Sequence, residues 1–105
     1  MAWLSLIAAG LFEIGWPIGL KLGWTEDGPR PGWIAFAIAS MAISGALLLL
    51  AQRTIPIGTA YAVWTGIGAV GTFTVGIYAF GDASSTMRLF SIALIVVGIA
   101  GLKFG

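Results

Sequence analysis

The strongest constraint on the fold is a series of four long apolar segments, each separated from the next by a short polar stretch. The segments cover about residues 2–22, 33–51, 57–80 and 87–104 of the 105-residue sequence. Each is close to the roughly 20 apolar residues with which an α-helix crosses a bilayer. A spanning β-strand would need only about 10 residues of alternating character, which these continuous runs do not show. The sequence therefore predicts an all-α membrane protein with four transmembrane helices in one domain, residues 1–105.

The composition supports this class and excludes several others. Hydrophobic residues make up 59% of the chain and charged residues only 9%, against about 25% charged residues in a typical soluble domain. A net charge of +1 offers no basic surface for nucleic acid. The absence of cysteine and histidine removes disulfides, thiolate metal sites and histidine triads. We therefore expect no metal, no cofactor and no nucleic-acid partner.

The connections between the segments are short, so consecutive helices should lie antiparallel in a membrane bundle. Basic residues in such connections bias the orientation of a membrane protein. Three fall on one side and two on the other: Lys21, Arg30 and Arg88 against Arg53 and Lys103. This near balance is compatible with insertion in either orientation, and hence with an antiparallel pair of identical subunits.

Glu13 is the only charged residue between Ala2 and Leu20, and it lies just past the middle of the first segment. An ionised carboxylate at that depth costs about 2.5–3.5 kcal/mol on scales of membrane insertion. Acids in such positions usually carry protons or bind cations. We expect Glu13 to be a proton carrier, a cation ligand or both. A purely structural, hydrogen-bonded carboxylate is the alternative.

The residues one helical turn from Glu13 form a candidate pocket. Ala9 and Gly10 precede it and leave space beside the carboxylate, while Trp16 follows it. An indole can donate its N–H to a carboxylate or offer its face to a cation. Pro17 removes a backbone hydrogen bond close to Glu13, so we expect a kink there. The alternative is that the small residues and Trp16 serve only helix packing.

The third segment carries an aromatic face and a run of glycines. Tyr61, Trp64 and Gly68 share one face of the expected helix. Residues 66–71 match the G-x-G-x-x-G pattern of dinucleotide-binding proteins, but they lie inside a membrane span with no preceding strand, so we reject that function. The glycines instead predict a flexible point or a close helix contact. They are Gly66, Gly68 and Gly71.

The second and fourth segments offer fewer candidates. Ser40 and Ser44 are the only hydroxyl groups of the second segment, and each can bond the carbonyl four residues earlier or serve a site. Gly98 and Gly101 mark a packing face on the fourth segment. Four helices that contain a single buried acid are poorly suited to enclose a transport pathway on their own. We therefore expect dimerisation through the fourth segment, with both glycines at the interface.

Several short stretches fit one family pattern. They are Met1–Leu4, Ala9–Glu13 with Trp16, Gly19–Lys21, Ile55–Ala69, Met87–Leu89 and Gly98–Lys103. Together they resemble the small multidrug resistance transporters, and within them the guanidinium-exporter branch. The resemblance extends over essentially the whole chain.

This resemblance implies a proton-coupled exporter of guanidinium and small substituted guanidinium ions in the bacterial cytoplasmic membrane. It implies an antiparallel dimer, of two copies of this chain or of this chain with a related subunit, whose central site holds one Glu13 from each subunit. The chain departs from the family pattern at Pro17, where a small residue is usual, and at Asp82, where glutamate is usual. The residues implied around the carboxylates are Trp16, Ser44, Tyr61 and Trp64.

Two facing carboxylates would supply a simple exchange mechanism. A guanidinium ion binds a carboxylate through two parallel N–H bonds, as arginine does. A proton and the cation then compete for the same acids. If the site opens to one side at a time, and changes side readily only when occupied, a proton gradient drives efflux of the cation.

Other functions stay open on the sequence alone. A broad exporter of quaternary ammonium ions would use the same fold with a looser, aromatic-lined site. A proteolipid subunit of a rotary ATPase also buries a carboxylate among glycines, but its acid typically lies on a later helix than the first. An enzyme is not expected, because the sequence offers no nucleophile–base pair and no set of metal ligands.

Overall fold

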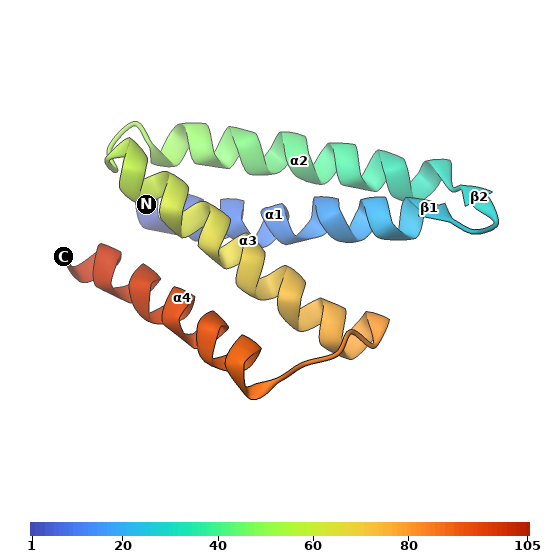
Figure 1. Ribbon diagram of the computed structural model, residues 1–105. Helices are drawn as coiled ribbons and strands as arrows, with labels where there is room; N and C mark the ends of the chain where they lie inside the picture. The colour runs from blue at the N-terminus through green and yellow to red at the C-terminus, as the bar shows by residue number, and fades with distance from the viewer.

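The computed structural model describes residues 1–105 as four helices and one small β-hairpin (Figure 1). The helices are α1 (Ala2–Gly23), α2 (Pro31–Ala51), α3 (Ile57–Phe80) and α4 (Thr86–Phe104), and the strands are β1 (Trp24–Thr25) and β2 (Gly28–Pro29). All four helices are long and apolar enough to cross a membrane. The predicted all-α, four-helix membrane fold is confirmed, and the helix boundaries agree with the expected ones to within two residues.

Proline, glycine and serine set several of the helix ends. α2 begins at Pro31, whose ring already holds a helical φ and whose missing N–H would have no partner in a first turn. α3 ends at Phe80 and is followed by Gly81, which adopts a left-handed φ of 69°. α4 begins after Ser85, whose hydroxyl accepts the backbone N–H of Arg88 at 3.2 Å.

The short polar connection between α1 and α2 contains a β-hairpin. Trp24 pairs with Pro29 and Thr25 with Gly28 in an antiparallel hairpin. Gly28 permits the tight turn because its φ is +105°, a region that other residues rarely adopt. The hairpin holds the ends of α1 and α2 together.

α1 and α2 lie side by side over their length (Figure 1). A row of glycines spaced four residues apart on α1 allows this close approach. A Cβ added at Gly15 would lie 2.8 Å from Ser40 Oγ, and one at Gly19 would lie 2.9 Å from Ala37 Cβ. Gly23 continues the row against Ile34. Small residues at such spacing are what membrane helices use to pack without a hydrophobic driving force between them.

α3 crosses the α1–α2 pair, and α4 lies apart from that pair (Figure 1). A buried cluster joins the first three helices near the α2–α3 connection, and its members are Leu6, Ala51, Ile55, Ala60 and Val63. α4 has no buried residue, and it contacts α3 where Ile95 and Ile99 lie over Gly66.

Gly98 and Gly101 face open space, with nothing within 4 Å of an added Cβ. The packing face expected on α4 is therefore not used within one subunit, and its role in a dimer stays a prediction.

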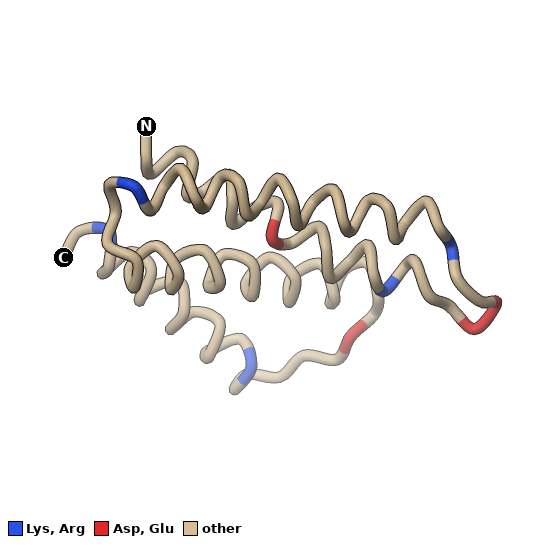
Figure 2. The backbone as a smooth tube through the Cα atoms, turned by 90° about the horizontal axis from the view of Figure 1, so that it is seen from above, with Lys and Arg blue, Asp and Glu red and all other residues tan.

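The charged residues gather at the helix ends and in the connections, with one acidic residue midway along the bundle (Figure 2). We call the end that carries the β-hairpin, the C-terminus of α3 and the connection to α4 the hairpin end. The opposite end carries both chain termini and the α2–α3 connection. The acid in the middle is Glu13, as the sequence predicts.

Candidate functional site

Glu13 lies half-buried in the middle of α1, and its closest polar partner comes from its own helix. The indole Nε1–H of Trp16 donates a hydrogen bond of 2.7 Å to Glu13 Oε1. The spacing of three residues places the two side chains on neighbouring positions of one face. α1 remains helical through Pro17, and the kink expected there stays a prediction.

Two glycines permit the close contact between α1 and α3 near the carboxylate. At Gly68, on α3, an added Cβ would lie 2.5 Å from Glu13 Cγ, so the acid side chain occupies the space that any larger residue would need. At Gly10, on α1, an added Cβ would lie 2.7 Å from Ile67 Cβ, which lets α3 approach closely.

Three glycines of α3 lie in close contact with residues of α1 and α4. α3 is continuous from Ile57 to Phe80. Gly68 faces Glu13, Gly71 faces Ile14 and Gly66 faces Ile99 of α4. The close helix contact expected from the sequence is thus present at all three glycines, and the flexible point stays a prediction.

A second set of hydrogen bonds joins three helices next to this pair. Ser44, fully buried on α2, donates to the Ala9 carbonyl of α1 at 2.7 Å. It accepts the indole Nε1–H of Trp64, on α3, at 2.8 Å. The Tyr61 ring lies 5.6 Å from the Trp64 ring at an interplanar angle of 54°. Ser44 thus bonds across the bundle instead of bonding the carbonyl four residues before it.

The two sets lie at adjacent levels of the contact between α1 and α3. Ala9 precedes Glu13 by one turn on α1, and Trp64 precedes Gly68, which meets Glu13, by one turn on α3. The five expected residues therefore lie within neighbouring turns, although no hydrogen bond joins Glu13 directly to Ser44, Tyr61 or Trp64. Tyr61 is 58% exposed and is the only one of the five that points mainly out of the subunit.

From the residues alone, Ser40 and Ser44 could each bond the carbonyl four residues earlier or serve a site, whereas the family resemblance implied Ser44 alone. The structure separates the two serines in the same way. Ser44 belongs to the hydrogen-bonded set, whereas Ser40 packs against Gly15 in the α1–α2 contact. Sequence reasoning also missed the glycine row of α1, although its spacing of four residues was a readable signal. It assigned no role in a site to Thr72, Lys21 or Asp82, which line a pocket at the hairpin end.

The chemistry available at this site is that of a single carboxylate. No group of three or more His, Cys, Asp or Glu side chains exists that could hold a metal ion. Glu13 can bind a proton or a cation, with Trp16 holding one oxygen in place and two further aromatic rings one turn away. Aromatic faces attract organic cations, particularly where water is excluded.

Comparison with known proteins identifies the family. A family model described as Small Multidrug Resistance protein matches residues 1–95. The chain belongs to this family. With its four spanning helices, this family member is a multi-pass protein of the bacterial inner membrane. The resemblance predicted from the sequence is confirmed.

Several relatives resemble this small multidrug resistance protein along almost its entire length. Proteins named guanidinium exporter from Citrobacter freundii and Salmonella typhimurium are each 51% identical over 105 residues, which cover 98% of this chain and 96% of the relative. A protein of the same name from Escherichia coli (strain K12) is 48% identical over 103 residues, with the same coverage.

Proposed function

We propose that this protein exports guanidinium and small substituted guanidinium ions in exchange for protons. The observation that carries the proposal is the Glu13 carboxylate, which lies in mid-helix, half-buried, and accepts the Trp16 N–H at 2.7 Å. The relatives named guanidinium exporter, at 48–51% identity, support guanidinium as the substrate. Proton coupling follows if one carboxylate serves both ions.

A complete site requires a second copy of the chain. Glu13 is only half-buried in one subunit, Tyr61 is exposed, and α4 has no buried residue. An antiparallel dimer would bring these surfaces of two subunits together, with Glu13 from each subunit at the centre and α4 at the seam. Gly98 and Gly101, which meet nothing within the subunit, would then lie at the interface.

In this dimer the residues would have separate roles. Glu13 binds either a proton or the cation, and it cannot bind both at the same oxygen. Trp16 fixes the carboxylate by donating its N–H. Ser44 holds Trp64 at a set position, so that the Tyr61–Trp64 pair presents aromatic surface to a planar cation. Exchange then requires only that the occupied dimer opens to alternate sides.

The Tyr61–Trp64 pair also supports a second candidate class of substrate. Tyr61 and Trp64 would suit a quaternary ammonium ion, which binds through aromatic faces and needs no hydrogen-bond acceptor. A guanidinium ion instead needs acceptors for its N–H groups, which the carboxylates supply. Family membership gives no support to the proteolipid hypothesis and favours a transporter over an enzyme.

The test is transport by purified protein in liposomes with an imposed pH gradient. Wild type should accumulate guanidinium against its gradient, and Glu13→Gln should abolish this uptake while inserting normally. Glu26→Gln, in the exposed hairpin turn, removes one acid from the same chain and should transport as wild type does. Undiminished proton-driven guanidinium uptake by Glu13→Gln would overturn the proposal, and uptake of tetramethylammonium alone would favour the alternative.

A further inference from the structure

A pocket lies between α1 and α3 on the side of Glu13 that leads to the hairpin end of the bundle. On α1, Pro17 and Lys21 follow Glu13 at intervals of four residues, and on α3 Thr72 and Gly76 follow Gly68 at the same interval. These residues line a pocket of 270 Å³ together with Phe80 and Asp82. Because residues four apart share one helix face, the pocket begins one turn beyond the Glu13 level. It therefore lies between the acid and the aqueous surface at that end.

The pocket already holds a cation. The Lys21 ammonium lies 4.9 Å from the centroid of the Phe80 ring, a distance at which the ring face attracts a positive charge. The Lys21 head group therefore lies where a free organic cation of similar size would also be stabilised.

Asp82 supplies the pocket with a carboxylate that has no other partner. The structure contains one salt bridge, between Arg30 and Asp27, so Asp82 forms none. Its backbone N–H donates to the Gly76 carbonyl at 3.0 Å, which fixes the residue over α3. A Cβ at Gly76 would collide with the Asp82 carboxylate, so the acid packs directly on the helix.

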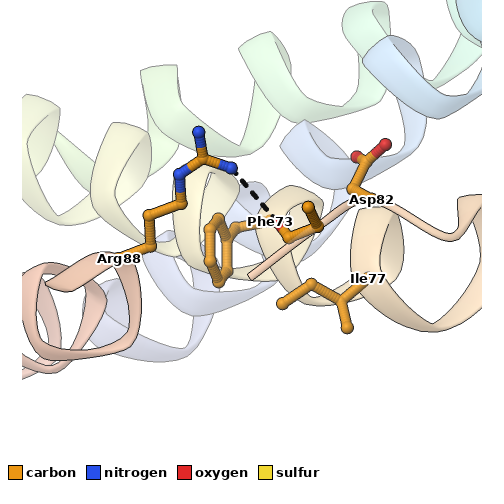
Figure 3. Close-up of a pocket in the computed structure, with 5 residues that line it drawn as sticks. Phe73, Ile77, Asp82 and Arg88 are labelled. Carbon is orange, nitrogen blue, oxygen red and sulfur yellow. Dashed lines mark hydrogen bonds between the residues drawn. The ribbon is translucent and has the colours of Figure 1, made fainter. Parts of the chain in front are cut away.

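Arg88 does not neutralise this acid. Figure 3 shows Arg88 and Asp82 on a neighbouring pocket, with the Asp82 carboxylate directed away from the guanidinium group. The Arg88 side chain donates instead to the Ala83 carbonyl at 3.2 Å. The negative charge of Asp82 thus remains available to a mobile cation.

Thr72 adds an uncommitted hydroxyl group. Thr65 and Thr74, on the same helix, each donate to the carbonyl four residues earlier at 2.8 Å. Thr72 makes no such bond, although it is half-buried and lines the pocket. Its oxygen can accept an N–H from a cation there without breaking an existing hydrogen bond.

We propose that this pocket is an outer binding station for the transported cation, and that Lys21 is a tethered competitor that occupies the station until the cation displaces it. The inference rests on the proposed function, because it takes the same guanidinium-type ion as ligand. The station offers a carboxylate from Asp82, an aromatic face from Phe80 and an acceptor from Thr72. It would raise the local concentration of the cation on its route between water and Glu13.

Such a station affects the rate of capture and not the equilibrium affinity at Glu13. Removing the Lys21 ammonium should speed the capture of the cation, whereas removing the Asp82 carboxylate should slow it. The two substitutions should therefore change the rate of capture in opposite directions. A purely structural role for Lys21 and Asp82 predicts that both substitutions impair transport.

The experiment measures the KM for guanidinium in proteoliposomes and the Kd by calorimetry of the purified protein. We expect Lys21→Met to lower the KM, and Asp82→Asn to raise it, each by about three- to tenfold. Thr72→Val, which removes a hydroxyl with no structural bond and keeps the shape, should raise the KM by about two- to threefold. The Kd should stay within about twofold of wild type in all three variants.

Matched controls lie at the same end of the molecule but outside the pocket. Arg30→Met and Asp27→Asn make the same changes in charge in the exposed hairpin and should leave the KM unchanged. The proposal is overturned if Lys21→Met fails to lower the KM, or if Asp82→Asn and Thr72→Val behave as the controls do. Failure of the wild type to transport guanidinium would instead overturn the proposed function, so the two outcomes are distinguishable.

Discussion

Ser44 Oγ accepts the Trp64 indole N–H at 2.8 Å and donates to the Ala9 carbonyl at 2.7 Å, so one side chain of α2 joins α3 to α1. Ser44 is fully buried, and its two partners lie one turn before Glu13 on α1 and one turn before Gly68 on α3. In a bilayer, a polar group without a partner costs several kcal/mol. These two bonds therefore fix how the three helices sit against one another at the site.

Ser44→Ala should destabilise the protein and weaken transport together. The substitution leaves the Trp64 N–H and the Ala9 carbonyl without their shared partner, at a cost of about 1–2 kcal/mol in a membrane helix bundle. Unfolding by SDS in mixed micelles, followed by tryptophan fluorescence, measures this change. Ser40→Ala is the control, because Ser40 forms no hydrogen bond to the site. Equal stability of the two variants would contradict the assigned role of Ser44.

Gly68→Ala should abolish transport while the helices remain inserted. The new Cβ would lie 2.5 Å from Glu13 Cγ, so the acid must leave its position or α3 must move away from α1. Overpacking of this kind typically costs about 1–3 kcal/mol. Gly45→Ala on α2, where an added Cβ meets nothing within 4 Å, provides the matched control. Guanidinium uptake by both variants at the wild-type rate would show that Gly68 does not make room for Glu13.

Trp16→Phe should weaken guanidinium binding while keeping an aromatic ring beside the acid. The variant loses the N–H that donates to Glu13 Oε1 at 2.7 Å. A hydrogen bond to a charged group contributes about 1.5–3 kcal/mol, so we expect the Kd at fixed pH to rise roughly tenfold or more. Calorimetric titration with guanidinium measures the change. An unchanged Kd would mean that the ring alone, and not its N–H, serves the site.

The helices could be predicted from the sequence because each apolar run ends at a proline, a glycine or a charged stretch. Glu13 and Trp16 could be paired because three residues within one helix fix their separation. Contacts within a single helix are local, and the sequence encodes them directly.

The contacts between helices were harder to predict because they depend on the position of one helix along another. Ser40 and Ser44 lie one turn apart on α2, and only the position of α2 along α1 decides which of them meets Ala9. The glycines of α3 were ambiguous for the same reason. Whether they allow bending or close contact depends on the partners opposite them, which include Glu13 and Ile14.

Gly98→Leu on α4 should reduce dimerisation without harming the fold of the subunit. An added side chain at Gly98 meets nothing within 4 Å in the subunit, and leucine favours a helix more than glycine does. If α4 packs against a second copy through this face, the new side chain should cost about 1–3 kcal/mol at the interface. Association would then weaken by roughly tenfold or more.

Crosslinking in liposomes at a series of protein-to-lipid ratios measures this loss, and guanidinium uptake should fall in parallel because one Glu13 does not complete the site. Gly45→Leu on α2 is the control, since Gly45 is equally open within the subunit but lies on a different helix. If the Gly98→Leu protein dimerises and transports as wild type does, the interface does not lie on this face of α4. The site would then have to be completed by another surface, such as the exposed side of α3 around Tyr61.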